Sequence, residues 1–221
     1  MKKTISTILT IVCIGLFLFH TYGPKPSYST LTDVPEYSGE PYVIINDNKP
    51  TFTEKELKAS PYEDYTELDY LNRPLRATAM INKSLMPTEE RGTIGSIKPP
   101  GWHTVKYDVV PGKYLYNRCH LIGHQLTGEN ANKNNLVTCT RYMNTEGMLP
   151  FENMVTDYIK ETNNKVLYRI TPIYKDNNLL IDGVQLEAQS IEDNSIEINI
   201  FIYNIQPGVV IDYETGKSSL E

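Results

Sequence analysis

The arrangement of apolar residues in the second half of the chain constrains the fold most strongly. Residues 144–161 repeat their apolar side chains at roughly helical spacing. Three runs that read as strands follow, and short polar turns separate them. These runs are residues 166–174, 179–187 and 196–203. Several strands around one long helix indicate an α+β fold with a largely antiparallel sheet.

Shorter apolar segments precede this helix and lie between loops rich in Gly, Pro and Asn. We expect strands at 41–46, at the end of 68–81, at 114–122 and at 136–140, a short helix within 52–57, and loops at 91–102 and 128–135. No internal repeat or second domain is evident, and 221 residues suit a single domain with a tail. We therefore expect one domain over 41–221, with the polar residues 28–40 as a linker.

The N-terminus has the pattern of an export signal. Lys2 and Lys3 precede a mostly apolar run over residues 5–19, and Pro24 and Pro26 then break any helix. A buried core helix is the alternative, but the run lacks a polar face. No small-residue cleavage site follows, so residues 1–27 are expected to be either a signal peptide or an uncleaved signal-anchor that holds the chain in the membrane through 5–19. Both place the protein outside the cell or on its surface.

Composition narrows the classes of function. Hydrophobic residues make up 40% of the chain and charged residues 22%, which excludes wholesale disorder. The net charge of −6 excludes a uniformly basic surface that coats nucleic acid, although a local basic cleft remains possible. Three cysteines are too few for a disulfide scaffold.

Two residues of the 114–122 strand could act on a phosphate. Alternation along a strand places Arg118 and His120 on the same face. A histidine can take a proton from water near neutral pH, and an arginine can hold a phosphate oxygen. A structural or surface pair is the alternative. His103 and His124 are not expected to take part in catalysis.

Asn144 and Glu152 lie eight residues apart on the predicted helix, on much the same side. Asn144 could cap the helix or could offer its carbonyl oxygen to a hard cation. Glu152 could hold a metal-bound water or could be an ordinary surface carboxylate. The neighbouring asparagines at 130, 132 and 134 are expected to serve the turns of a solvated loop.

Together these residues resemble the DNA/RNA non-specific endonuclease family, whose site is a ββα-metal finger. The resemblance rests on Asn117-Arg118-Cys119-His120, then Asn135, Asn144 nine residues on, and Glu152 eight residues further. The surrounding sequence, over roughly residues 65–216, is similar to the streptodornase-like and competence-nuclease-like branch of this family, which occurs in Gram-positive bacteria. This resemblance implies a ββα-metal nuclease core on the antiparallel sheet.

The resemblance also implies a role for each residue. His120 would be the general base, and Asn144 would be the direct protein ligand of Mg²⁺, for which Mn²⁺ could substitute. Glu152 and Asn135 would orient metal-bound waters and the site. Arg118 would contact the phosphate, and Arg73 would be a second phosphate contact. The substrates would be double- and single-stranded DNA, and RNA, cut to 5′-phosphate ends without base specificity.

Two positions depart from the family pattern. Asn117 replaces an Asp of many relatives, and Cys119 replaces the usual Gly. Cys119 could crowd the finger or could pair with Cys139 on the neighbouring strand; we expect two free buried thiols rather than a disulfide. A catalytically impaired nucleic-acid-binding protein, and a phosphodiesterase for another phosphate ester, are the alternative functions.

An acidic chain that binds a polyanion needs a local concentration of positive charge. We expect a basic groove made by residues of the loops and strands around the finger. Its members would be Arg73, Arg91, Lys98, Lys106, Arg118, Lys133 and Arg141.

Overall fold

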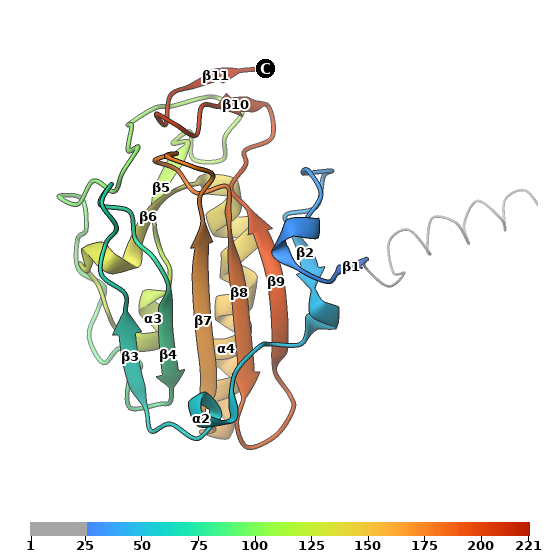
Figure 1. Ribbon diagram of the computed structural model, residues 1–221. Coiled ribbons are helices and arrows are strands. Elements are labelled where there is room, and N and C mark those ends of the chain that lie inside the picture. Colours follow the sequence, from blue (N-terminus) through green and yellow to red (C-terminus); the bar gives the residue numbers. More distant parts are fainter. Residues whose placement is uncertain (1–25) are drawn as a thin grey trace, which may run out of the picture.

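The computed structural model describes residues 26–221 (Figure 1). The apolar run 5–19 of the predicted signal lies outside this range. Within the described range no helix is long and apolar enough to cross a membrane.

One large sheet forms the centre of the molecule. Its strands follow the order β1-β2-β9-β8-β7-β4-β3, and every neighbouring pair is antiparallel except β1 and β2. The strands are β1 (Ser27–Tyr28), β2 (Tyr42–Ile45), β3 (Tyr62–Tyr65), β4 (Ala77–Ile81), β7 (Val166–Ile173), β8 (Gly183–Ser190) and β9 (Glu197–Tyr203). The expected α+β class with a largely antiparallel sheet is thus confirmed.

Two small antiparallel pairs lie beside the large sheet. The hairpin of β5 (Tyr116–His120) and β6 (Leu136–Thr140) carries the Asn-Arg-Cys-His segment. A second pair, β10 (Val209–Ile211) and β11 (Ser218–Leu220), lies near the C-terminus (Figure 1). The sequence pattern did not predict β1, β3, β10 or β11, because strands of two to four residues are too short to show a clear alternation.

The helical elements are mostly short. They are η1 (Leu31–Asp33), η2 (Asn46–Asn48), α2 (Glu54–Leu57), α3 (His124–Thr127), η3 (Lys133–Asn135), η4 (Met143–Met148) and α4 (Leu149–Thr162). The long helix α4 lies across one face of the sheet, behind β7 and β8 in the view of Figure 1. The expected helix over 144–161 is therefore present, but its first turn, η4, is a π-helix.

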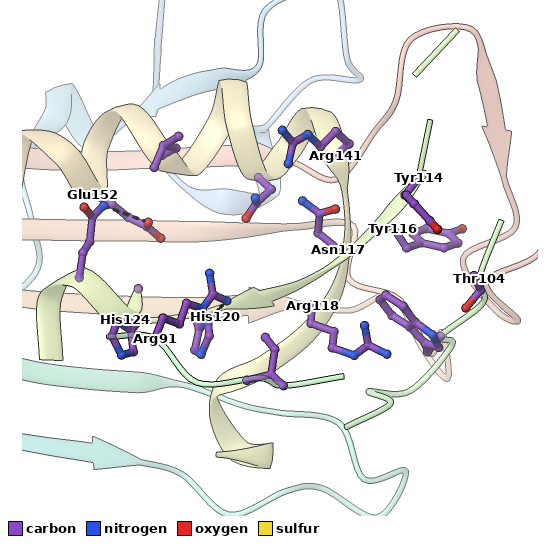
Figure 2. Close-up of a pocket in the computed structure, with 16 residues that line it drawn as sticks. Arg91, Thr104, Tyr114, Tyr116, Asn117, Arg118, His120, His124, Arg141 and Glu152 are labelled. Carbon is purple, nitrogen blue, oxygen red and sulfur yellow. Dashed lines mark hydrogen bonds between the residues drawn. The ribbon is translucent and has the colours of Figure 1, made fainter. Parts of the chain in front are cut away.

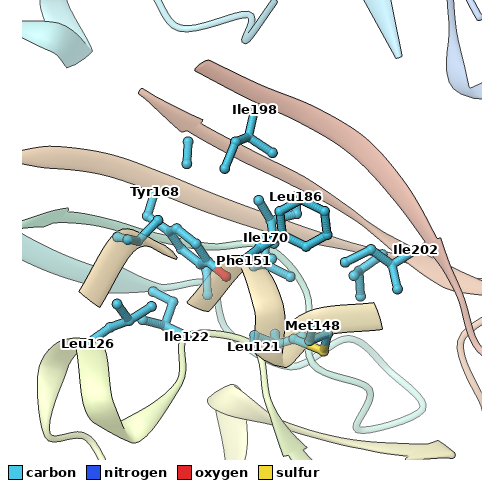
Figure 3. Packing of buried hydrophobic residues seen from close by; sticks show 14 of the residues in the cluster. Leu121, Ile122, Leu126, Met148, Phe151, Tyr168, Ile170, Leu186, Ile198 and Ile202 are labelled. Atoms are coloured by element: carbon cyan, nitrogen blue, oxygen red, sulfur yellow. The ribbon is translucent and has the colours of Figure 1, made fainter. Parts of the chain in front are cut away.

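The main core fills the space between α4, the β5–β6 hairpin and the sheet (Figure 3). Alternate residues of each central strand face α4, as Ile170 of β7, Leu186 of β8 and Ile202 of β9 do. Phe151 of α4 closes the same core, because helical spacing turns its apolar face toward the sheet. The β5–β6 hairpin and α4 are thus attached to the sheet through buried apolar contacts.

Residues 28–40, expected to be a linker, lie against the domain. Tyr28 and Tyr37 pack on a small core around Phe201 and Tyr203 of β9. The Tyr203 hydroxyl donates a hydrogen bond of 2.9 Å to the carbonyl oxygen of Pro35. Tyrosine rings in a polar segment supply enough apolar surface to hold it in place.

Candidate active site

A cavity of about 670 Å³ opens between the β5–β6 hairpin, the start of α4 and the 91–104 loop (Figure 2). Four sequence-predicted residues line it: Arg118, His120, Asn144 and Glu152. The strand β5 contributes the first two from one face, as its alternation predicts. The chain therefore brings most of the predicted site together.

Both ring nitrogens of His120 have partners. Nε2 lies 2.7 Å from the carbonyl oxygen of Asn130, which only accepts, so Nε2 carries the proton. Nδ1 lies 3.1 Å from Nη2 of Arg91, which only donates. The ring is consequently a neutral imidazole whose basic nitrogen is Nδ1. Burial, and secondarily the Arg91 charge, lower the pKa of His120 to about 4, against the effect of the Asn130 hydrogen bond.

Arg91 is the cation nearest to this base. It lies in the loop after β4, lines the cavity, and points toward His120 in Figure 2. A guanidinium here can hold a phosphate oxygen beside Nδ1. The sequence predicted Arg91 only as one member of a general basic groove, because its distance along the chain from His120 follows no recognisable motif.

Asn144 and Glu152 lie on the wall that the helix supplies. Asn144 belongs to the π-helical turn η4, a rare conformation that often occurs at functional sites. Its Oδ1 atom lies 3.2 Å from Sγ of Cys119. Glu152 is in the first turn of α4, where its carboxylate faces Gly123. The two oxygen-bearing side chains thus reach one cavity from the consecutive helical elements η4 and α4.

The buried Glu152 carboxylate has few hydrogen bonds or charges that compensate for its loss of hydration. Gln125 Nε2 lies 3.5 Å from Oε2, at the limit of a hydrogen bond. Desolvation raises the pKa of Glu152 to about 7, although Gln125 and Arg91 act in the opposite direction. A desolvated carboxylate near an amide oxygen is a donor set that suits a hard divalent cation with several waters. In residues 26–221, this cavity included, no group of three or more His, Cys, Asp and Glu residues could hold a metal, so a cation here would keep most of its ligands as water.

Arg118 lines the cavity, but much of its guanidinium is bound to protein. Nη2 donates to the carbonyl oxygen of Gly95 at 2.9 Å, and Nε donates to that of Ile97. The guanidinium also stacks 3.9 Å above the ring centre of Trp102. Arg118 therefore holds the 95–102 loop over the cavity, in addition to placing positive charge there.

Asn135 and Arg73 do not line the cavity. The Asn135 amide exchanges two hydrogen bonds with the backbone of Ile122, at 2.9 and 3.0 Å, and is fully buried. It fixes the chain just after His120. Arg73 is buried in an ion pair of 2.7 Å with Asp69 and stacks on Tyr174. Its Nε and Nη1 atoms donate hydrogen bonds inside the fold, so the structure does not bring Arg73 to the cavity, and the expected phosphate contact remains a prediction without structural support.

Cys119 and Cys139 form a disulfide, so the expectation of two free thiols is wrong. Their Cα atoms lie 5.9 Å apart, within the usual range for the bond. Cys119 pairs with Val137 and Cys139 with Asn117, so the cysteines are diagonal neighbours on the same face of the hairpin. The sequence predicted that the two strands are neighbours, but it did not predict which residues face each other across them.

Three further residues in or beside the cavity were not predicted from the sequence to take part in the site. Asn130 was assigned to a loop turn, although its carbonyl oxygen fixes the His120 tautomer. His124 was set aside, although it lines the cavity. Gly123 approaches Glu152 so closely that a Cβ atom there would lie 2.7 Å from Oε2. Backbone contacts and close approaches leave no residue-type signal, so a single sequence could not reveal them.

Comparison with known proteins finds one matching family and several similar structures. Residues 53–192 match the model of the DNA/RNA non-specific endonuclease family. The fold is similar to the crystal structure of NucA from Streptococcus agalactiae with no metal bound, with a TM-score of 0.75 and 27% identity over 86% of this chain and 92% of that one. NucA from the same organism with a magnesium ion bound gives a TM-score of 0.71 and 28% identity over 80% and 85%. The Sda1 nuclease with a bound zinc ion gives 0.64 and 26% over 72% and 80%.

Proposed function

Because the chain belongs to the DNA/RNA non-specific endonuclease family and is therefore an endonuclease, we propose that it is an exported, Mg²⁺-dependent enzyme that cuts DNA and RNA to 5′-phosphate ends. One observation carries the proposal. The basic Nδ1 atom of His120 lies in the same cavity as Asn144, Glu152 and Arg91. A base, an oxygen-rich site and a phosphate-binding cation are the parts that phosphodiester hydrolysis needs.

His120 acts as the general base in this proposal. Its Nδ1 atom takes a proton from the attacking water while Nε2–H stays bound to the Asn130 carbonyl oxygen. The water oxygen forms the new bond to phosphorus, the bond to the 3′ oxygen breaks, and the 3′ oxygen takes a proton from solvent water to leave as a hydroxyl. Arg91 occupies Nδ1 before substrate binds, so an incoming phosphate must draw the guanidinium away. This exchange frees the base only when substrate is present.

Asn144 and Glu152 would hold the divalent cation, which when bound supplies positive charge for the phosphate oxygens and the leaving 3′ oxygen. Asn144 would contribute its Oδ1 atom directly, and Glu152 would orient water around the site. Magnesium is the proposed ion because its few protein ligands and many waters match this donor set. The magnesium-bound NucA and zinc-bound Sda1 structures support a divalent ion in this family.

The remaining proposals concern substrate range and location. Three arginines line the cavity, Arg91, Arg118 and Arg141, which favours contacts to the phosphate backbone shared by DNA and RNA. The basic and apolar N-terminal residues favour export, with residues 1–27 either cleaved or retained as an anchor through 5–19. Residues 41–221 would then form the nuclease domain.

Plasmid nicking tests the proposal. The wild-type chain should cut supercoiled DNA in Mg²⁺ and should lose this activity in EDTA. His120→Ala should reduce cleavage at least about 100-fold, because general-base catalysis contributes on that order. His103→Ala is the matched control, because His103 is exposed and its ring binds the carbonyl oxygen of Thr215 outside the cavity. A wild-type chain that binds DNA without cutting it would favour the catalytically impaired binding protein instead.

A further inference from the structure

A row of side chains leads away from His120 along the floor of the cavity. His120, Arg118 and Tyr116 are alternate residues of β5, and Tyr114 continues the row beyond the strand (Figure 2). Six residues of extended chain separate Tyr114 from His120, about 20 Å at the usual rise per residue. A bound strand whose phosphate reaches His120 can follow this row for several nucleotides.

Tyr114 differs from the other aromatic residues of the cavity wall. Tyr116 is buried, and its hydroxyl donates to the carbonyl oxygen of Gly216 at 3.0 Å. Trp102 is covered by the Arg118 guanidinium. Tyr114 remains 48% exposed, although its hydrophobic ring lies at the mouth of a polar cavity. Lys106 Nζ lies 4.4 Å from its ring centre. Lys106 and Tyr114 pair across an isolated antiparallel bridge, which sets the lysine beside the ring while the ring itself stays exposed on the cavity wall.

We propose that Tyr114 is a stacking platform for an unpaired base of the substrate, several nucleotides from the cleaved phosphate. The proposal rests on the proposed nuclease function and extends it to substrate class. An aromatic ring beside a cation is the arrangement by which proteins hold single strands without reading their sequence. Lys106 adds positive charge where the strand passes. In a duplex the bases are already stacked and paired, so the ring contributes only to flexible, single-stranded DNA or RNA.

Binding measurements on the full chain test this proposal. The His120→Ala chain in Mg²⁺ would be titrated with a single-stranded oligodeoxynucleotide carrying 2-aminopurine, whose fluorescence falls when it stacks, and with a hairpin duplex of the same sequence. Tyr114→Ala in this background should weaken single-strand binding about 10-fold and abolish part of the quenching, because base stacking contributes on that order. The affinity for the duplex should change less than about two-fold. Tyr114→Phe should keep the affinity and the quenching of the chain that retains Tyr114, because phenylalanine also stacks.

Tyr70→Ala is the matched control, because Tyr70 is a 77% exposed tyrosine that does not line the cavity. It should leave both affinities unchanged. Equal losses for single strand and duplex, equal losses in Tyr114→Ala and Tyr114→Phe, or no loss at all would each overturn the stacking role. Failure of the nuclease function would show separately, as absence of Mg²⁺-dependent cleavage by the chain that retains His120.

Discussion

At the scale of single residues, the chemistry of the site depends on how the backbone holds one imidazole ring. The Asn130 carbonyl oxygen directs the proton of His120 to Nε2, and Arg91 confirms Nδ1 as the acceptor. Burial keeps the ring neutral, because a charged imidazolium would lose its hydration. A base that stays neutral is ready to accept a proton over the whole neutral range.

The lowered pKa of His120 gives the first prediction. In the metal-free protein its ring should titrate near pH 4, well below the ordinary 6.5. The unfolded chain binds this proton first as the pH falls, so the stability that His120 contributes is complete above pH 6.5 and is lost toward pH 4. NMR of the imidazole nitrogens would measure the midpoint, and His120→Ala would identify the signal. A midpoint at or above 6.5 would contradict the buried, neutral ring.

Gly123 gives a second prediction at this scale. A Cβ atom there would lie 2.7 Å from Oε2 and 2.8 Å from Cδ of Glu152, so Gly123→Ala must displace the carboxylate. A displacement of about 1 Å in a catalytic site can cost on the order of 100-fold in rate. We expect a loss of this size in Mg²⁺-dependent cleavage, while the thermal unfolding midpoint stays within a few degrees of wild type.

Gly95→Ala is the control for that measurement, because a Cβ atom at Gly95 meets nothing within 4 Å and its carbonyl oxygen can still bind Arg118. Full activity in Gly123→Ala would mean that the position of Glu152 does not affect cleavage, and would contradict its proposed role in the site.

At the scale of elements, the β5–β6 hairpin has a covalent link between its two strands. The disulfide links β5 to β6, and Sγ of Cys119 lies against the Asn144 side chain that would bind the cation. Cys119, the residue that departs from the family pattern, therefore contacts the side chain proposed to bind the cation. Apolar burial then ties the hairpin to α4 and the sheet.

Removal of this bond gives the third prediction. Cys119 and Cys139 are separated by 20 residues, and closing a loop of this size stabilises a protein by about 3 kcal/mol. The double variant Cys119→Ala, Cys139→Ala should lose on that order of unfolding free energy in urea titrations. Reductant should destabilise the wild-type chain and leave the double variant unchanged. Thiol titration of the unfolded, unreduced chain should find one free cysteine, Cys13; three would contradict the disulfide.

At the scale of the whole molecule, an acidic chain must bind a polyanion. The formal charge is −6, and the first 27 residues hold three lysines and no acidic residue, so a chain without them would carry −9. Three of the seven cations expected in a groove, Arg91, Arg118 and Arg141, line the cavity. These three arginines concentrate positive charge at the cavity of a chain that is acidic overall, which favours binding of a polyanion there.

Salt dependence gives the fourth prediction. Binding of duplex DNA by the His120→Ala chain should weaken steeply as salt rises, because each neutralised phosphate releases counterions. Arg141→Gln should reduce the log–log slope by about 1, the effect of one lost phosphate contact. Lys58→Gln should leave the slope unchanged, because Lys58 is exposed, pairs with Glu54 and lies outside the cavity. A flat salt response would contradict the local basic groove.

The sequence alone determined the fold class and most of the site. Strand alternation, one amphipathic helix and the fixed spacings from Arg118 to Glu152 depend on local geometry, which residue order specifies directly. These features predicted the α+β class. The resemblance to a known family predicted that His120, Asn144 and Glu152 belong to one site, and all three line the same cavity.

Only the tertiary structure decided which distant residues complete the site. Arg91 approaches His120 across 29 positions of the chain, whereas Arg73 is buried in its own ion pair. The diagonal register of β5 and β6 joins Cys119 to Cys139, and packing places Tyr114 at the cavity mouth. Such contacts depend on loop paths and strand register, which the packing of the whole chain sets and which no local spacing encodes.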